Sequence, residues 1–160
     1  MRGKRFVAVH RGGLLNKEHH RLLIHWAHMC AAHVLPYFGQ TIDERLNRSL
    51  RLAKAWEHGE ISVGEARKAS LEAIAVANEN SNPASIAVAR SVGHVAATAH
   101  MADHSLRAAD YALKAIKICA QSVDAERKWQ DEQLPVDIKN LVLSARKGKP
   151  SNLRGIKRIY

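Results

Sequence analysis

The chain has 160 residues, and its 25 lysines and arginines outnumber 15 acidic residues to give a formal net charge of +10. Hydrophobic residues make up 46% of the chain and charged residues 25%, as in ordinary globular proteins, so a wholly disordered chain is excluded. Alanine occurs 25 times, and only 5% of the residues are aromatic. Because alanine is the strongest helix former, this composition excludes an all-β fold and predicts an all-α one.

The positive charge is concentrated at the two ends of the chain. Residues 1–11 include four basic and no acidic residues, and the residues after position 138 include seven basic and no acidic ones. The segment between them holds 14 basic and 15 acidic residues, so the body of the protein is close to neutral. This distribution argues against a nucleic acid bound along the fold, because such binding depends on phosphate neutralisation.

The C-terminal end of the chain is a basic tail, residues 149–160. It contains Arg154, Lys157 and Arg158 together with scattered apolar residues. Three alternatives are open: an end that is solvated or packs on the body or on a second copy of the chain, contact with an acidic protein partner, and nucleic-acid binding by phosphate neutralisation.

Other features of the sequence indicate a cytoplasmic protein. Cys30 and Cys119 are too few for a disulfide framework, and both fall in helix-like apolar stretches where buried thiols are expected. No run of 18 apolar residues is present, so no membrane span is expected. The N-terminus also lacks the apolar core of a secretory signal.

The N-terminal third of the chain predicts an arm followed by two helices. The apolar segment 6–10 is expected to form a short extended arm that ends at two glycines. Asn16 is suited to cap a helix over 18–35, which Pro36 ends. A second helix begins after Asp43 and ends before a glycine at position 59.

A capping box predicts the start of the third helix. Ser62 and Glu65 have the spacing at which each side chain accepts a hydrogen bond from the other residue's backbone N–H. The helix is expected over 63–78, and its inward face is predicted to carry Ala66, Ala69, Leu71, Ala73, Ile74 and Ala77.

The segment from Pro83 to Gln121 contains no further proline. As one helix it would be about 58 Å long, whereas a compact domain of this size is roughly 40 Å across. We therefore expect a break at 103–105, with Asp103 as the cap of a new helix. Two shorter helices, at 124–133 and 136–147, complete the chain. The predicted fold is a compact bundle or array of six to seven helices in a single domain, residues 1–148.

Histidine is the residue type that most suggests chemistry, with ten in the chain. On a continuous helix, His100 and His104 would lie about 40° apart and Asp103 about 60° to the other side of His100, with His94 further round. These four residues are a candidate site for a divalent metal or a small ligand. The alternative is structural: Asp103 caps a helix and the histidines serve the fold.

Two further groups of residues carry weaker expectations. Five histidines between positions 19 and 33 are expected to face solvent, except His20, which can turn inward. Three tryptophans lie on apolar stripes and are expected in the core. Trp129 and Gln130, just before a Leu-Pro pair, form a candidate partner-binding feature at a helix end.

No phosphate-binding loop, nucleophile elbow or Cys-x-x-Cys pair occurs in the chain. A binding protein is therefore favoured over an enzyme, although an enzyme using the four-residue histidine cluster stays open.

Several segments resemble one family of bacterial proteins. They are KRFVAVHRGG at 4–13, GEISVGEAR at 59–67 and GHVAATAHMADH at 93–104, with shorter matches as far as the Leu-Pro pair at 134–135. These segments are similar to the immunity proteins of bacterial polymorphic toxin systems, over residues 4 to about 143.

The resemblance implies an α-helical fold and a protein that binds and neutralises a toxin made by the same cell. It supplies no catalytic residues. Such a protein works by stoichiometric occlusion, which needs a complementary surface rather than an active site.

Overall fold

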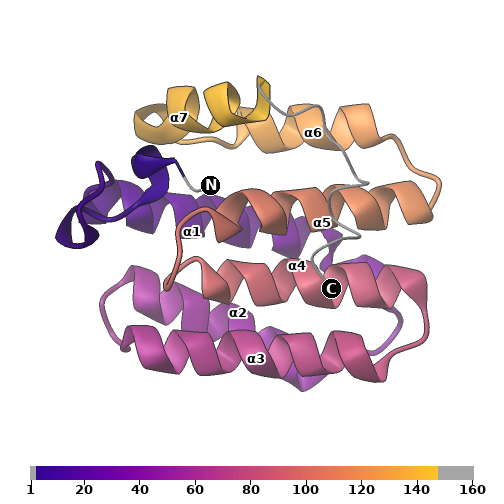
Figure 1. The fold of residues 1–160 in the computed structure, drawn as a ribbon. Coiled ribbons are helices and arrows are strands. Elements are labelled where there is room, and N and C mark those ends of the chain that lie inside the picture. Colours follow the sequence, from indigo (N-terminus) through magenta and orange to yellow (C-terminus); the bar gives the residue numbers. More distant parts are fainter. Residues whose placement is uncertain (1–2, 148–160) are drawn as a thin grey trace.

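The computed structural model describes residues 3–147, and Figure 1 shows that they form an array of α-helices. The seven α-helices are α1 (Lys17–Val34), α2 (Glu44–Glu57), α3 (Val63–Glu79), α4 (Pro83–Ala97), α5 (His104–Ile118), α6 (Val123–Glu132) and α7 (Val136–Lys147). Three short 3-10 helices accompany them: η1 (Lys4–Phe6), η2 (Val9–Arg11) and η3 (Leu35–Phe38). The predicted all-α fold and the helix count are confirmed.

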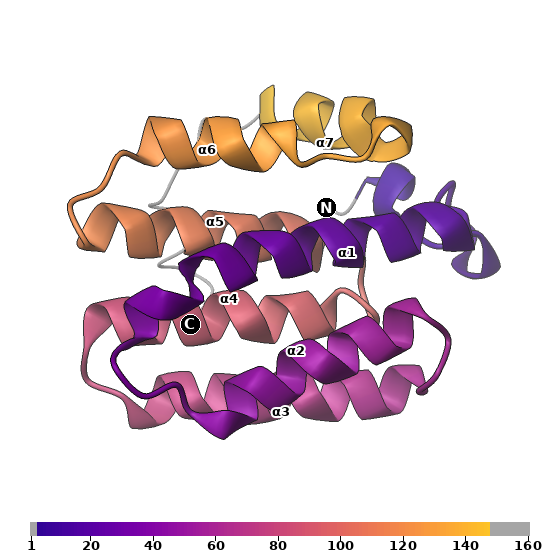
Figure 2. The ribbon, with the colours of Figure 1, turned by 180° about the vertical axis from the view of Figure 1, so that it is seen from behind.

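The helices form two layers, and α4 lies in the middle of one layer and contacts helices of the other. Figure 1 shows α3, α4, α5 and α6 stacked side by side, and Figure 2 shows α1 and α2 across the opposite face. Helix α4 contacts α1, α2, α3 and α5, whereas α6 contacts α5 and α7 contacts α1. This position explains why α4 has the longest run of buried residues, from Ser91 to Ala96.

Polar side chains mark where most of the helices begin. Asn16 accepts a hydrogen bond from the backbone N–H of His19 at 2.8 Å. Ser62 and Glu65 form the predicted capping box, each side chain accepting from the other residue's backbone N–H. Each cap satisfies N–H groups that the first turn of a helix leaves unpaired.

Small residues let α3 and α4 approach closely. Gly93 on α4 faces α3, and a Cβ at this position would lie 3.0 Å from the Cγ1 of Ile74 and 3.5 Å from the carbonyl oxygen of Ser70. Alanines occupy most of the other buried positions on α3. The alanine content therefore serves close packing as well as helix formation.

The predicted break in the long segment 83–121 is confirmed. Helix α4 ends at Ala97, and α5 begins at His104. The hydroxyl of Thr98 donates to the carbonyl of His94 at 2.8 Å, which satisfies one of the last carbonyls of α4. Asp103 occupies the N-cap position of α5, but its side chain makes no capping hydrogen bond there.

The prediction that the N-terminal segment is extended is wrong. The segment coils into η1 and η2 and folds back on itself, with Leu15 donating to the carbonyl of Val7 at 2.9 Å. The reversal occurs at Gly12, which has a φ of 84°, and at Gly13, where a Cβ would collide with the Val7 carbonyl. Because Gly12 and Gly13 can adopt this tight reversal, the backbone groups of the segment pair with one another. In an extended arm those N–H and C=O groups would have no partner within the segment.

Leu71 is a second correction, since it was predicted to face inward and is 60% exposed. Ser70 and Ala73 on the same helix are buried. Because successive residues are about 100° apart around a helix, Leu71 is turned away from the face that Ser70 presents to the core.

No helix among residues 3–147 is long and apolar enough to cross a membrane. The basic tail, 149–160, lies outside the described residues, and so does the predicted domain boundary at 148.

Candidate functional site

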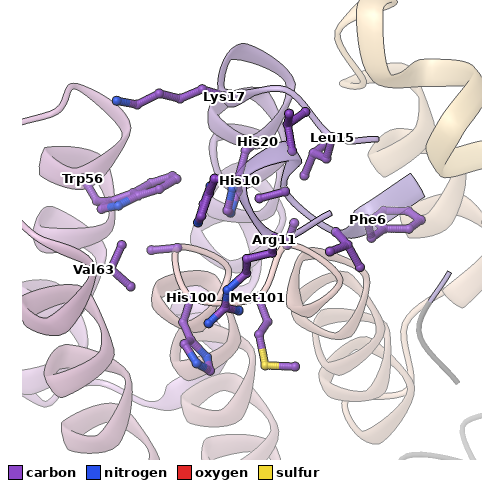
Figure 3. A pocket seen from close by; sticks show the side chains of 15 residues that line it. Phe6, His10, Arg11, Leu15, Lys17, His20, Trp56, Val63, His100 and Met101 are labelled. Carbon is purple, nitrogen blue, oxygen red and sulfur yellow. The ribbon is translucent and has the colours of Figure 1, made fainter. Parts of the chain in front are cut away.

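A cavity of about 740 Å³ opens at the end of the array where the N-terminal segment folds back (Figure 3). Its walls come from three parts of the chain. Residues 6–11 and 15 form one side, Trp56 and Val63 form the opposite side, and residues 99–102 of the α4–α5 connection also line it. Sites for small ligands or peptide segments commonly measure about 300–1,000 Å³, so the cavity has a suitable size.

The polar residues that line this cavity are all basic. They are His10, Arg11, Lys17, His20 and His100, and no aspartate or glutamate is among the lining residues. Figure 3 shows the side chains of Lys17 and Arg11 on different sides of His10. A cavity whose lining includes cationic side chains and no acidic ones attracts anionic groups.

The wall around Trp56 is held in place from inside the fold. His20 on α1 is buried and donates from Nε2 to the carbonyl oxygen of Thr98 at 2.6 Å. Its ring centroid lies 4.8 Å from that of Trp56. Burial, together with the charge of His10, lowers the pKa of His20, so its imidazole is neutral at neutral pH. The inward orientation expected for His20 is confirmed.

The four residues predicted as a metal or ligand site are not gathered into one site. His94 on α4 and His104 on α5 face each other, with their Nδ1 atoms 2.8 Å apart. His100 instead lines the cavity described above. Among residues 3–147, no group of three or more His, Cys, Asp and Glu side chains is arranged to hold a metal ion. The turn at 98–103 breaks the helical phase on which the metal arrangement depended, and a role of these residues in binding a small ligand stays a prediction.

The His94–His104 pair fits a structural role. At an Nδ1–Nδ1 distance of 2.8 Å, one ring donates the proton and the other accepts it. Burial and the neighbouring His104, Arg107 and Arg90 lower the pKa of His94 to about 3. His94 also stacks on Tyr111 at 5.3 Å and is therefore part of the α4–α5 contact.

The two described residues of the predicted partner surface have different environments. Trp129 on α6 is half-buried and stacks on His33, with their centroids 3.6 Å apart. His33 in turn donates to the Glu126 carboxylate at 2.6 Å. Trp129 therefore connects α6 to α1. Part of its side chain stays accessible, so a contact between Trp129 and a partner stays a prediction.

Gln130, by contrast, is 0% exposed, so the surface role expected for it does not fit the structure. Its Nε2 donates to the carbonyl of Ala109 at 3.0 Å, and its Oε1 accepts from Arg146 at 2.7 Å. Its backbone carbonyl accepts from the indole of Trp26 at 2.8 Å. Gln130 thus joins four helices from inside. Arg154, Lys157 and Arg158 lie outside the described residues.

The cavity and most of its lining residues were not predicted from the sequence. The excess of basic residues in 1–11 was visible in the sequence. The turn that brings Arg11 opposite Trp56 depends on Gly12 and Gly13, which the sequence analysis interpreted only as the end of an arm.

The described residues form an all-helical fold with a cavity of a size that suits binding. A family model described as "Imm-5 like putative immunity protein" matches residues 13–137. Since this range is more than half of the chain, the protein belongs to that immunity-protein family, as the resemblance predicted. A search of the curated proteins and a search of the solved structures find no significant match to the chain.

The family match does not include residues 4–12, which the resemblance had included. Trp56, Val63 and His100 lie within the matched range, whereas His10 and Arg11 precede it. The two sides of the cavity therefore come from the matched region and from the segment before it.

Proposed function

We propose that this protein is an immunity protein that binds a toxin made by the same bacterial cell and neutralises it by covering the toxin's working surface. The observation that carries the proposal is the match of the immunity-protein family model over residues 13–137. Neutralisation of this kind takes one inhibitor molecule per toxin molecule and occurs in the cytoplasm, before the toxin leaves the cell that makes it.

Two properties of the described residues support a binding role. The helices pack through extensive alanine-rich contacts, and a binder that is already folded loses little conformational entropy when its partner docks. The N-terminal segment also exposes apolar side chains, Val9 and Leu14. A docked partner that covers these side chains removes their apolar surface from water, which favours binding.

The proposal is tested by growth rescue. Each candidate toxin gene beside this protein's own gene is expressed in a bacterial host with and without the protein. We expect the cognate toxin to arrest growth alone and to be neutralised on co-expression, and the purified pair to form a 1:1 complex in light scattering after size-exclusion chromatography.

The matched control replaces a buried core residue. Leu46 is fully buried, so Leu46→Asp places a charge in the core and should abolish rescue by preventing folding. Failure of the unmodified protein to neutralise or bind any neighbouring candidate would refute the proposed function.

A further inference from the structure

The described cationic side chains differ in whether they are paired with carboxylates. On α2, Arg45, Arg48 and Arg51 each lie within 4 Å of a carboxylate, and the pairs include Arg45–Asp43 at 2.9 Å and Arg51–Glu44 at 2.8 Å. Within residues 3–147, Arg11 and Lys17 form no such ion pair. The cavity therefore presents cationic side chains whose charge this part of the chain does not neutralise.

The rim of the same cavity is apolar on opposite sides. Val9 on the N-terminal segment is 59% exposed, and Val63 at the start of α3 is 42% exposed. Trp56 and Met101, both labelled in Figure 3, are further apolar residues that line the cavity. An anion alone would use the cations but would leave these apolar groups in water.

We propose that this cavity is the docking site for the toxin, and that it receives a projecting segment in which a carboxylate is flanked by apolar side chains. The inference rests on the proposed function, since it takes the partner to be a protein. The carboxylate pairs with Arg11 and Lys17, and the flanking side chains contact Val9 and Val63.

The surroundings of the cavity suit an inserted segment of protein. The opposite wall is preorganised, because the hydrogen bond from His20 to Thr98 and the contact between His20 and Trp56 tie α1, α2 and the α4–α5 connection together. His20 stays neutral there, so Arg11 and Lys17 supply the permanent charge. Anchoring residues of a partner usually insert into pockets with well-packed walls, and a wall that is already rigid lowers the conformational cost of binding.

The test uses the toxin identified by growth rescue, in a catalytically inactive form, and two matched pairs of charge reversals. The first variant is Arg11→Glu with Lys17→Glu, both at exposed positions. The control is Lys117→Glu with Lys139→Glu, exposed on α5 and α7 and outside the cavity lining. Each variant changes the net charge by the same amount, so long-range attraction is matched. Affinity is measured by isothermal titration calorimetry, with circular dichroism to verify folding.

We expect the cavity variant to bind at least about 100-fold more weakly and the control less than about threefold more weakly, because only the first places like charges against the bound carboxylate. Val9→Asp should weaken binding in the same direction. Equal affinity of the cavity variant and the control would overturn the docking site while leaving the proposed function intact. Failure of the unmodified protein to bind any toxin would instead count against the proposed function.

A second arm probes the cavity without the toxin. A blocked hexapeptide of alternating leucine and glutamate is titrated into ¹⁵N-labelled protein, beside the same peptide with glutamine in place of glutamate. We expect the acidic peptide to shift the Trp56 indole signal and the amide signals of Arg11 and Met101, and the shifts to disappear in the Arg11→Glu, Lys17→Glu variant. If no toxin is identified, this arm decides: the absence of shifts, or equal shifts with the glutamine peptide, overturns the proposal. Equal or larger shifts with benzoate at the same concentration would assign the cavity to small carboxylates and also overturn it.

Discussion

Replacing Arg146 with methionine tests whether buried polar contacts hold the last two helices on the array. The guanidinium of Arg146 on α7 donates to Asp131 at 2.7 Å and to Gln130 at 2.7 Å, both on α6. It also lies 5.0 Å from the centroid of the Trp26 ring on α1. Arg146 is only 9% exposed, so Arg146→Met keeps most of the apolar stem and removes both donors.

The expected cost comes mainly from Gln130. Its side-chain oxygen would stay buried without the Arg146 donor, which costs about 1–3 kcal/mol. The ion pair adds up to about 1 kcal/mol, because the Asp131 side chain is 31% exposed and water can solvate it. We therefore expect a loss of about 1–4 kcal/mol in the free energy of unfolding.

A double-mutant cycle makes the reasoning testable. Gln130→Leu removes the buried acceptor, so the Arg146→Met, Gln130→Leu double variant should lose about 1–2 kcal/mol less than the sum of the single losses. Unfolding in urea is followed by far-UV circular dichroism. The control is Lys139→Met, exposed on the same helix, which should stay within about 0.5 kcal/mol of the unmodified protein. A loss below 0.5 kcal/mol for Arg146→Met, or strict additivity in the cycle, would refute the network as a stabilising element.

Three further predictions concern protonation, capping and thiol reactivity. Because His94 has a folded pKa of about 3 against an ordinary 6.5, the unfolded chain binds its proton more readily. Stability is therefore full above pH 6.5 and falls on acidification toward pH 3, by about 1.4 kcal/mol per pH unit. His94→Gln should make this slope shallower in urea melts between pH 7 and 4.5, and an unchanged slope would contradict the assignment. Ser62→Ala should cost about 1 kcal/mol by removing the capping box, while Ser81→Ala in an exposed turn serves as a neutral control; equal losses would exclude the cap. Cys30 is fully buried and its pKa is raised by that burial, whereas Cys119 is partly exposed, so a thiol reagent should label Cys119 in the native protein and both residues only in denaturant.

Local signals in the sequence were enough to predict the helices. Ser62 and Glu65 predicted the start of α3, and Pro36 predicted the end of α1. These signals work because a cap or a proline acts within one helical turn of its own position. The break near residue 103 needed only the length of a helix and the size of a compact domain.

The contents of the candidate site were harder to predict, because they depend on where the chain turns. The proposed convergence of His94, His100, Asp103 and His104 assumed one continuous helix. The turn after Ala97 separates His100, which lines the cavity, from the paired rings of His94 and His104. An angle computed along a helix has no meaning across a turn.

The sequence by itself determined that this protein is helical, where most of its helices begin and end, and that its positive charge lies near the termini. Only the tertiary structure decided that Arg11 and Lys17 line one cavity with Trp56, and that Gln130 lies inside the array. Helix boundaries follow from interactions between residues a few positions apart. The buried network joins residues from 15 to 104 positions apart, such as Trp26 and Gln130, and no local pattern encodes those contacts.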